Sequence, residues 1–263
     1  MDIDAFWQLI ADSLEHAPGR AAREHYLEGR LAALAPDGIV AFQAFLDRAC
    51  DRAFTWDLVG AATRIFGGWC SDDGFEYFRL WLAGRGRVTF ERAITMPGSL
   101  ATVPAIQRLA GRRRREWSDD EEWPEWETLD YIAANAYRLV TGTGDECGED
   151  FYDAVRTQLG GTSFRRHPDG ERWDAADEPA AAMKIPHWPR ASPSMTRSDP
   201  QPTGDARAQQ LPGLSQHGRP VPFRASGSPR THKVRAHCSP SSMNPPTTAP
   251  GTPHSGQLPS SAE

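Results

Sequence analysis

The sequence predicts an all-α protein: a single helical domain of about eight or nine helices, followed by a disordered C-terminal tail. Over residues 3–159, apolar side chains recur at intervals of three and four, as on one face of an α-helix. No segment shows the sustained apolar and polar alternation that indicates a half-buried strand. Eight of the nine tryptophans and all five tyrosines precede residue 180, so the hydrophobic core belongs to that part of the chain.

Helix-ending and helix-starting residues divide the first half of the domain into five segments. Pro18 and Gly19 end a helix that begins at Ile3, and Pro36 ends a second, which begins near residue 21. A third spans residues 37–53, and Thr55 is an N-cap for a fourth that Gly67 and Gly68 close. For the fifth, over residues 75–83, Asp73 and Glu76 have the spacing of a capping box.

Four further helices complete the predicted domain. Two span residues 88–95 and 99–110, and Pro104 inside the second can start a helix rather than break one. Thr128 or Glu127 opens a helix that Gly142 ends, and the last covers residues 150–159. The fifth helix has almost no polar face, which places it at the centre of the fold, as core or as the lining of a ligand pocket.

The chain changes in composition near residue 178. Residues 1–179 carry 20 basic and 32 acidic side chains, whereas residues 180–263 carry 9 and 3, together with 15 of the 22 prolines. Few aromatic residues follow residue 179, and burying them cannot offset the entropy cost of ordering the chain. We therefore expect residues 179–263 to be disordered. The protein has 27 arginines and two lysines, a bias typical of GC-rich genes, and we hypothesise that the tail from about residue 185 onward is a frameshifted or read-through extension.

Several classes of protein are excluded by the sequence. No run of apolar residues is long enough for a membrane helix, and the N-terminus is acidic rather than basic, so we expect a cytoplasmic protein with no membrane contact. The four cysteines show no pairing motif or zinc spacing, which indicates reduced thiols. Phosphate-binding loops, dinucleotide fingerprints and known hydrolase motifs are not found in the sequence.

The segment from Thr55 to Arg79 resembles the bacterial family of unknown function DUF4240. The resemblance is carried by T-W-D-L at residues 55–58, by G-G at 67–68 and by C-S-D-D-G-F-E-Y-F-R at 70–79. Phe6 and Trp7 at the start and Tyr137 near the end agree with it, so that it covers residues 1 to about 178. It implies no catalytic assignment.

An acidic cluster beside aromatic residues is the main candidate site. Its carboxylates can hold a divalent metal ion, with Arg64 or Arg79 orienting a phosphate or carboxylate ligand. Alternatively they are structural: Asp73 and Glu76 cap the fifth helix, Asp72 favours its dipole, and Arg79 pairs with an acid. The cluster consists of Asp57, Asp72, Asp73 and Glu76.

Two further features have both functional and structural interpretations. Cys70 precedes a helix start, where a thiol can become a nucleophile, but no histidine motif accompanies it and a buried inert cysteine is favoured. Arg112–Arg115 lies beside Trp117, Trp123 and Trp126 and can bind nucleic acid. The four acids at residues 119–122 favour a self-neutralising loop instead, or a protein-docking surface.

We therefore predict a non-enzymatic helical module that binds a partner protein or small ligand, with no cofactor. Its expected surface includes Trp56, Asp57, Asp72, Asp73, Glu76 and Arg79. The first alternative is a metal-assisted hydrolase of phosphate or similar esters, with Asp57, Asp72, Asp73 and Glu76 as ligands or base. The second is nucleic-acid binding through Arg112–Arg115, which the acidic domain disfavours.

Overall fold

The computed structural model describes residues 1–117, 121–142, 149–160 and 165–186. These residues form ten α-helices and two 3-10 helices and no strand, which confirms the predicted all-α class. In chain order the elements are α1 (Ile3–His16), α2 (Arg20–Ala32), α3 (Pro36–Arg52), α4 (Trp56–Ile65), α5 (Asp72–Gly84), α6 (Arg87–Thr95), η1 (Pro97–Thr102), α7 (Pro104–Gln107), η2 (Arg114–Glu116), α8 (Leu129–Thr141), α9 (Glu149–Gln158) and α10 (Glu178–Lys184).

Local chemistry explains the helix boundaries. The Thr55 hydroxyl accepts a hydrogen bond from the backbone N–H of Leu58 at 3.2 Å and so caps α4 as predicted. Gly142 adopts a left-handed conformation with φ of +65° and ends α8, as the sequence predicts. The helix predicted over residues 99–110 is instead split into η1 and α7, because Pro104 has no N–H to continue the first and begins the second.

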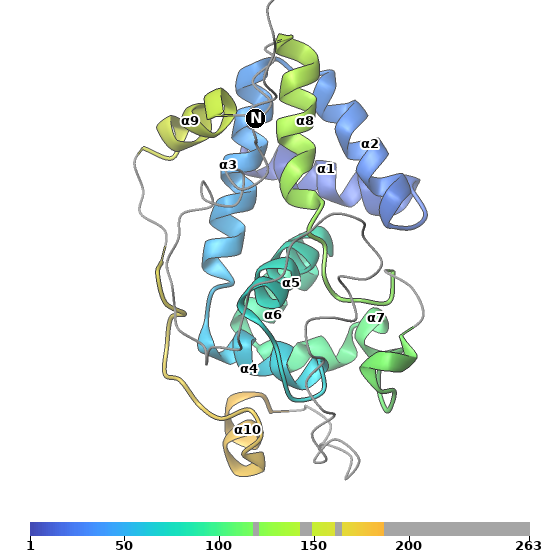
Figure 1. Ribbon diagram of the computed structural model, residues 1–263, viewed down its shortest axis with the longest axis vertical. Helices are drawn as coiled ribbons and strands as arrows, with labels where there is room; N and C mark the ends of the chain where they lie inside the picture. The colour runs from blue at the N-terminus through green and yellow to red at the C-terminus, as the bar shows by residue number, and fades with distance from the viewer. Residues whose placement is uncertain (118–120, 143–148, 161–164, 187–263) are drawn as a thin grey trace, which may run out of the picture.

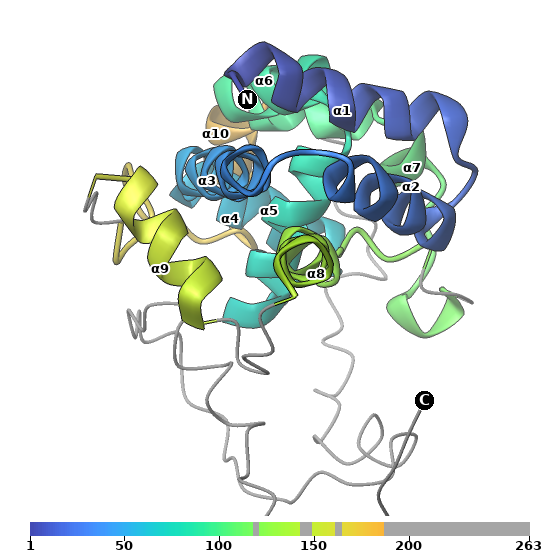
Figure 2. The same cartoon turned by 90° about the horizontal axis from the view of Figure 1, so that it is seen from above.

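The helices pack in layers around α5. Figure 1 shows α3 and α8 running side by side, with α2 beside α8 and α9 against the outer side of α3. Seen from above, α1 and α6 lie on one side of the molecule and α8 on the other, with α2 and α3 between them (Figure 2). The helix α5 contacts α3, α4, α6 and α8, so it occupies the central position that its apolar sequence predicts.

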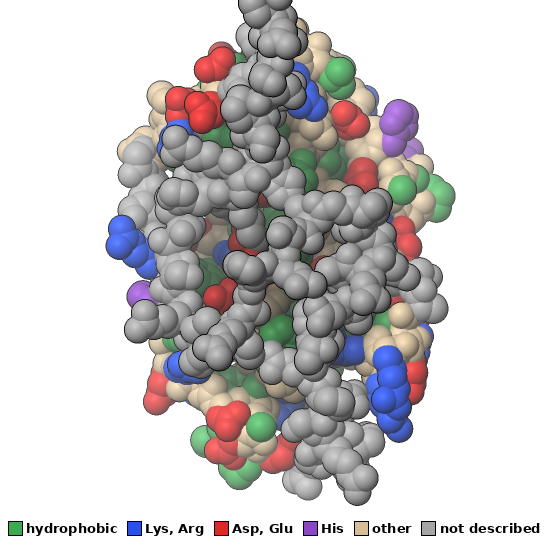
Figure 3. Space-filling view, viewed as in Figure 1, with side chains coloured by type: hydrophobic (Ala, Val, Ile, Leu, Met, Phe, Trp, Pro, Cys, Tyr) green, Lys and Arg blue, Asp and Glu red, His purple; other side chains and the backbone are tan. Residues whose placement is uncertain are grey.

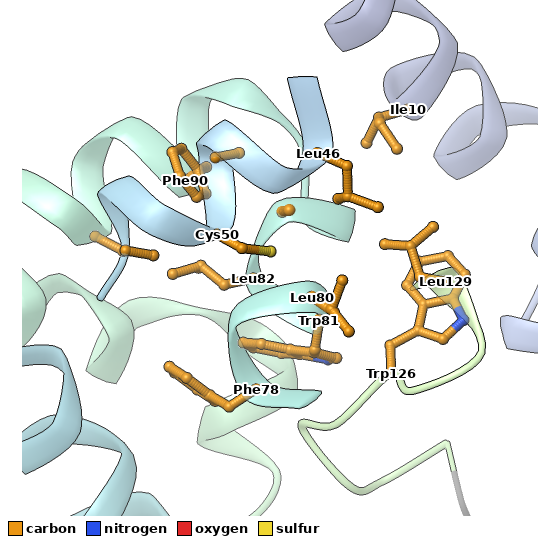
Figure 4. Packing of buried hydrophobic residues seen from close by; sticks show 14 of the residues in the cluster. Ile10, Leu46, Cys50, Phe78, Leu80, Trp81, Leu82, Phe90, Trp126 and Leu129 are labelled. Atoms are coloured by element: carbon orange, nitrogen blue, oxygen red, sulfur yellow. The ribbon is translucent and has the colours of Figure 1, made fainter. Parts of the chain in front are cut away.

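The side chains of α5 belong to one hydrophobic core that the other helices share. Leu80 and Leu82 are buried among residues from α1, α3, α6 and α8, and Cys50 of α3 lies close to Leu82 (Figure 4). Fully burying a side chain of this size stabilises the fold by about 1.5–3 kcal/mol. The other labelled members of the cluster are Ile10, Leu46, Phe78, Trp81, Phe90, Trp126 and Leu129.

Residues 165–186, which we call the C-terminal strap, run across α3 and α4 to η1. The Arg165 backbone N–H donates to Asp51 Oδ1 at 2.8 Å, and the Trp56 N–H donates to the Asp169 carbonyl at 2.9 Å. Near its end, a Cβ placed on Gly98 would lie 2.2 Å from the Pro186 carbonyl oxygen, so only glycine allows this approach. The strap is therefore an integral part of the helical domain.

The end of the strap lies on the tail side of the boundary predicted at residue 178. Helix α10 begins there, with Asp177 as its N-cap, and both Ala181 inside it and Ile185 directly after it are buried. Most of the predicted tail, residues 187–263, lies outside the described residues. The hypothesis of a changed reading frame concerns these residues.

Candidate functional site

The predicted site residues of α4 lie beneath the C-terminal strap. The Trp173 indole N–H donates to Asp57 Oδ1 at 3.0 Å, and the Arg172 guanidinium lies 5.2 Å from the centre of the Trp56 ring. The carboxylate of Asp57 therefore holds the strap, and the strap covers the start of α4. This partner lies 116 residues away in sequence, and no local pattern predicts it.

The first turn of α5 carries Asp72 and Asp73 on the surface. Its N-cap is Ser71, whose hydroxyl accepts from the Gly74 N–H at 3.0 Å, so the predicted capping by Asp73 and Glu76 is wrong. The helix begins three residues earlier than predicted, and both aspartates stand in its first turn, where the helix dipole favours a negative charge. Burial and the neighbouring Asp73 raise the pKa of Asp72 above its ordinary value.

The two arginines considered as anion ligands point into the fold. Arg79 donates to the Cys50 carbonyl at 2.9 Å, and its guanidinium lies 4.7 Å from the centre of the Phe54 ring. Arg64 is 8% exposed and donates to the Ala175 carbonyl and to Glu178 Oε1, both at 2.8 Å. These contacts join α5 to α3 and α4 to the strap.

The described residues contain no group of three or more His, Cys, Asp or Glu side chains placed to hold a metal ion. The contact of Asp57 with Trp173 ties that carboxylate to the strap at the first turn of α4. The metal-assisted alternative therefore gains no support from the geometry of the acidic cluster.

The thiol of Cys70 is a weak acid in this fold. Burial, followed by the nearby carboxylate of Glu125, raises its pKa to about 12. A nucleophilic cysteine needs the opposite shift, because the thiolate is the reactive form. The environment therefore supports the interpretation of Cys70 as an inert residue.

The arginines of residues 112–115 contact acidic and aromatic side chains of nearby segments. Arg112 forms a two-pronged ion pair with Glu122 at 2.5 and 2.9 Å, and Arg113 lies near Glu116. Arg114 lies 5.0 Å from the centre of the Trp123 ring. The basic side chains visible beside α7 at the edge of the molecule in Figure 3 belong to a surface where both signs of charge are interspersed. These contacts support the self-neutralising loop.

The tryptophans of this segment pack back onto the fold. Trp117 and Trp123 meet edge to face with ring centres 4.8 Å apart. The Trp126 ring packs under the Arg23 guanidinium at 4.5 Å, and its indole N–H donates to Glu24. Rings held this way are not available for stacking on bases.

A pair of tyrosines that the sequence did not single out completes the acidic surface. The hydroxyls of Tyr77 on α5 and Tyr131 on α8 both donate to Glu127 Oε1, at 2.7 and 3.3 Å. Burial, followed by Glu127, raises the pKa of Tyr131 to about 12. Burial and the same carboxylate raise the pKa of Tyr77 well above its ordinary value, and Asp73 contributes.

We call this surface the tyrosine–carboxylate site. It joins the start of α5 to the start of α8, and its carboxylates come from both helices. Glu76 and Asp130 are close enough to raise the pKa of Tyr131. The residues of the site are Asp73, Glu76, Tyr77, Glu127, Asp130 and Tyr131.

Comparison with known proteins identifies a family but no activity. No described helix has both the length and the apolar character needed to cross a membrane. No curated protein and no solved structure matches the chain. The model of the family described as "Protein of unknown function (DUF4240)" matches residues 1–139, which includes the tyrosine–carboxylate site and ends inside α8. The chain therefore belongs to the DUF4240 family.

Proposed function

We propose that this protein is a non-enzymatic binding module of the cytoplasm, and that its tyrosine–carboxylate site recognises a positively charged segment of a partner protein. The observation that carries the proposal is the convergence of two phenol groups on Glu127, within a group of further carboxylates. Carboxylates form charge-assisted hydrogen bonds with Lys and Arg side chains, and aromatic rings attract the same cations through their faces.

The exposure of the site supports this role. Glu127 and Asp73 are exposed, Tyr131 is 39% exposed, and Glu76 and Tyr77 are half-buried. Burial is the largest cause of the raised pKa values of both tyrosines, and Glu127 adds to it, since a nearby negative charge disfavours the phenolate. A cation can therefore reach these carboxylates without displacing a buried side chain.

The acid–base properties favour binding over catalysis. The phenols of Tyr77 and Tyr131 and the thiol of Cys70 all hold their protons more tightly than usual. A general base or nucleophile near neutral pH needs the reverse shift. In this proposal, Asp72 and Asp73 add negative charge to the surface that binds the partner. Trp56, Asp57 and Arg79 are covered by other parts of the fold and hold that surface in place.

The proposal is tested with a fluorescently labelled arginine-rich peptide titrated against the full chain at several salt concentrations. We expect Glu127→Gln to raise the Kd about tenfold, the equivalent of one lost charge-assisted hydrogen bond, about 1.4 kcal/mol. Glu15→Gln is the matched control, because Glu15 is an exposed acid on α1, and α2 and α3 separate α1 from α8 (Figure 2). Equal affinity in the two variants would show that the peptide senses only the overall charge, and the proposal would be wrong.

A further inference from the structure

The C-terminal strap is held on the helices in the way a bound peptide is held, through a small number of contacts. Three residues of the range 165–186 are buried, and its one helix, α10, has seven residues. The strap pairs with the chain before α4 in an isolated parallel bridge, where the Asp169 N–H donates to the Phe54 carbonyl at 2.9 Å. A segment with so few buried side chains opens at a lower free energy than the domain beneath it.

The surface under the strap contains a slot for a flat aromatic ring. The Trp173 indole lies so close to Gly60 that a Cβ there would stand 2.2 Å from Cζ2, so glycine is needed to leave this room. At the end of the slot, Asp57 Oδ1 accepts a hydrogen bond from the indole N–H at 3.0 Å. Asp57 and Gly60 lie within residues 1–139, which the DUF4240 model matches, whereas Trp173 lies outside that range. The slot therefore belongs to the family domain, and its present occupant belongs to a later segment.

Arg64 forms the second part of this surface, one helical turn after Gly60 on α4. Its Nη1 donates to the Ala175 carbonyl and its Nη2 to Glu178 Oε1, each at 2.8 Å, while the buried Nε has no hydrogen-bond partner. Nε and Nη2 form one edge of the guanidinium, and their parallel N–H groups match the two oxygens of a carboxylate. Glu178 accepts from one of these two donors, so the strap satisfies Arg64 incompletely.

We propose that Asp57, Gly60 and Arg64 form a docking groove for a segment of a partner protein that carries a tryptophan followed by a carboxylate. The strap is the intramolecular competitor of this partner, because its own tryptophan and acid occupy the groove in the free protein. A partner whose carboxylate accepts from both Nε and Nη2 makes one charge-assisted hydrogen bond more than the strap and so displaces it. The groove offers a buried cation and is therefore distinct from the tyrosine–carboxylate site, whose carboxylates attract cations.

The test uses a fluorescently labelled peptide of residues 168–186 as the probe, titrated against the full chain and followed by anisotropy. The tethered strap competes at a high effective concentration, and Trp173→Ala in the chain removes its anchor from the slot. We therefore expect the peptide to bind Trp173→Ala with a Kd at least about tenfold lower than that of the wild type. Gly60→Ala in the Trp173→Ala background fills the slot and should abolish binding. Gly29→Ala in the same background is the matched control, because a Cβ there meets nothing within 4 Å.

Variants of the peptide test the ligand chemistry. A peptide with Glu178→Gln should bind the Trp173→Ala chain about tenfold more weakly, because its hydrogen bond to Arg64 is no longer charge-assisted at both ends. A Kd that is the same for the wild type and Trp173→Ala, or that Gly60→Ala leaves unchanged, would overturn the proposal. So would a wild-type dimer in sedimentation that Trp173→Ala dissociates, because the strap of a second copy would then be the occupant of the groove.

Hydrogen exchange of the wild type tests the release of the strap without any variant. The N–H groups of Asp169 and Trp56 bond across the bridge, and Phe78 lies inside α5. We expect the two bridge amides to be at least about a hundredfold less protected than the Phe78 amide, because the strap opens while α5 stays folded. Equal protection would show that the strap opens only when the whole domain unfolds, and no partner could then replace it on the folded protein.

Discussion

Replacing Gly60 with alanine should bring a methyl group into collision with the C-terminal strap. Gly60 lies inside α4, and a Cβ built there would stand 2.2 Å from Cζ2 and 2.7 Å from Cε2 of the Trp173 indole. Contacts this short do not occur in folded proteins, so the indole must move. Its hydrogen bond to Asp57 is then strained or lost.

Two opposing effects set the size of the change. Overpacking of this kind costs about 1–3 kcal/mol. Alanine in the interior of a helix is better than glycine by about 0.5–1 kcal/mol. We therefore expect Gly60→Ala to lower the free energy of unfolding by about 1 kcal/mol in the wild type. In a Trp173→Ala background the collision is absent, and the same substitution should raise the free energy of unfolding by about 0.5–1 kcal/mol.

The assay is urea unfolding of the full chain for the wild type, the two single variants and the double variant. The change of sign between backgrounds gives a coupling of about 2 kcal/mol between the two positions. Gly29→Ala in α2 is the matched control, because a Cβ there meets nothing within 4 Å, and it should be stabilising in both backgrounds. If Gly60→Ala and Gly29→Ala were equally stabilising in the wild type, the strap would not lie on α4.

Three further predictions concern α5 and the sites near its start. Ser71→Ala should lower the free energy of unfolding by about 1 kcal/mol through loss of the N-cap, whereas Asp73→Asn should have a smaller effect, as measured by thermal unfolding. Cys70 should react with a thiol reagent near neutral pH only after unfolding. Burial raises the pKa of Cys70 from 9.0 to about 12. The contribution of the protonated thiol to the free energy of unfolding is therefore complete below pH 9 and is lost as the pH rises through 12. The phenol of Tyr131 should ionise near pH 12 in an ultraviolet titration, and Glu127→Gln should bring that pKa back towards 10. An unchanged titration would contradict the contact between the two side chains.

The helices could be predicted from the sequence because helix signals are local. Apolar spacing, proline and the caps at Thr55 and Gly142 act within a few residues of the boundary that they set. The start of α5 was misplaced because three consecutive polar residues all have N-cap chemistry, and the choice of Ser71 over Asp73 depends on the path of the chain before the helix. Pattern alone does not separate these candidates.

The candidate site could be predicted only in part, because its partners are distant in sequence. The acidic residues of α5 were found from composition, but Glu127 lies 50 residues after Tyr77, on the segment that leads into α8. In the sequence, nothing distinguishes Asp57 from the other acids of the cluster. In the structure, its carboxylate accepts a hydrogen bond from the Trp173 indole. Side chains that meet through tertiary packing leave no periodic signal in a single sequence.

The position of α5 explains why its exposed acids lie at its start. A helix buried against four neighbours presents few polar groups along its length, because each is at least partly desolvated. Glu76 and Tyr77 are half-buried, and the exposed acids of α5, Asp72 and Asp73, lie where the helix enters the core. The apolar middle fixes both ends in position, so the proposed cation surface has a rigid support.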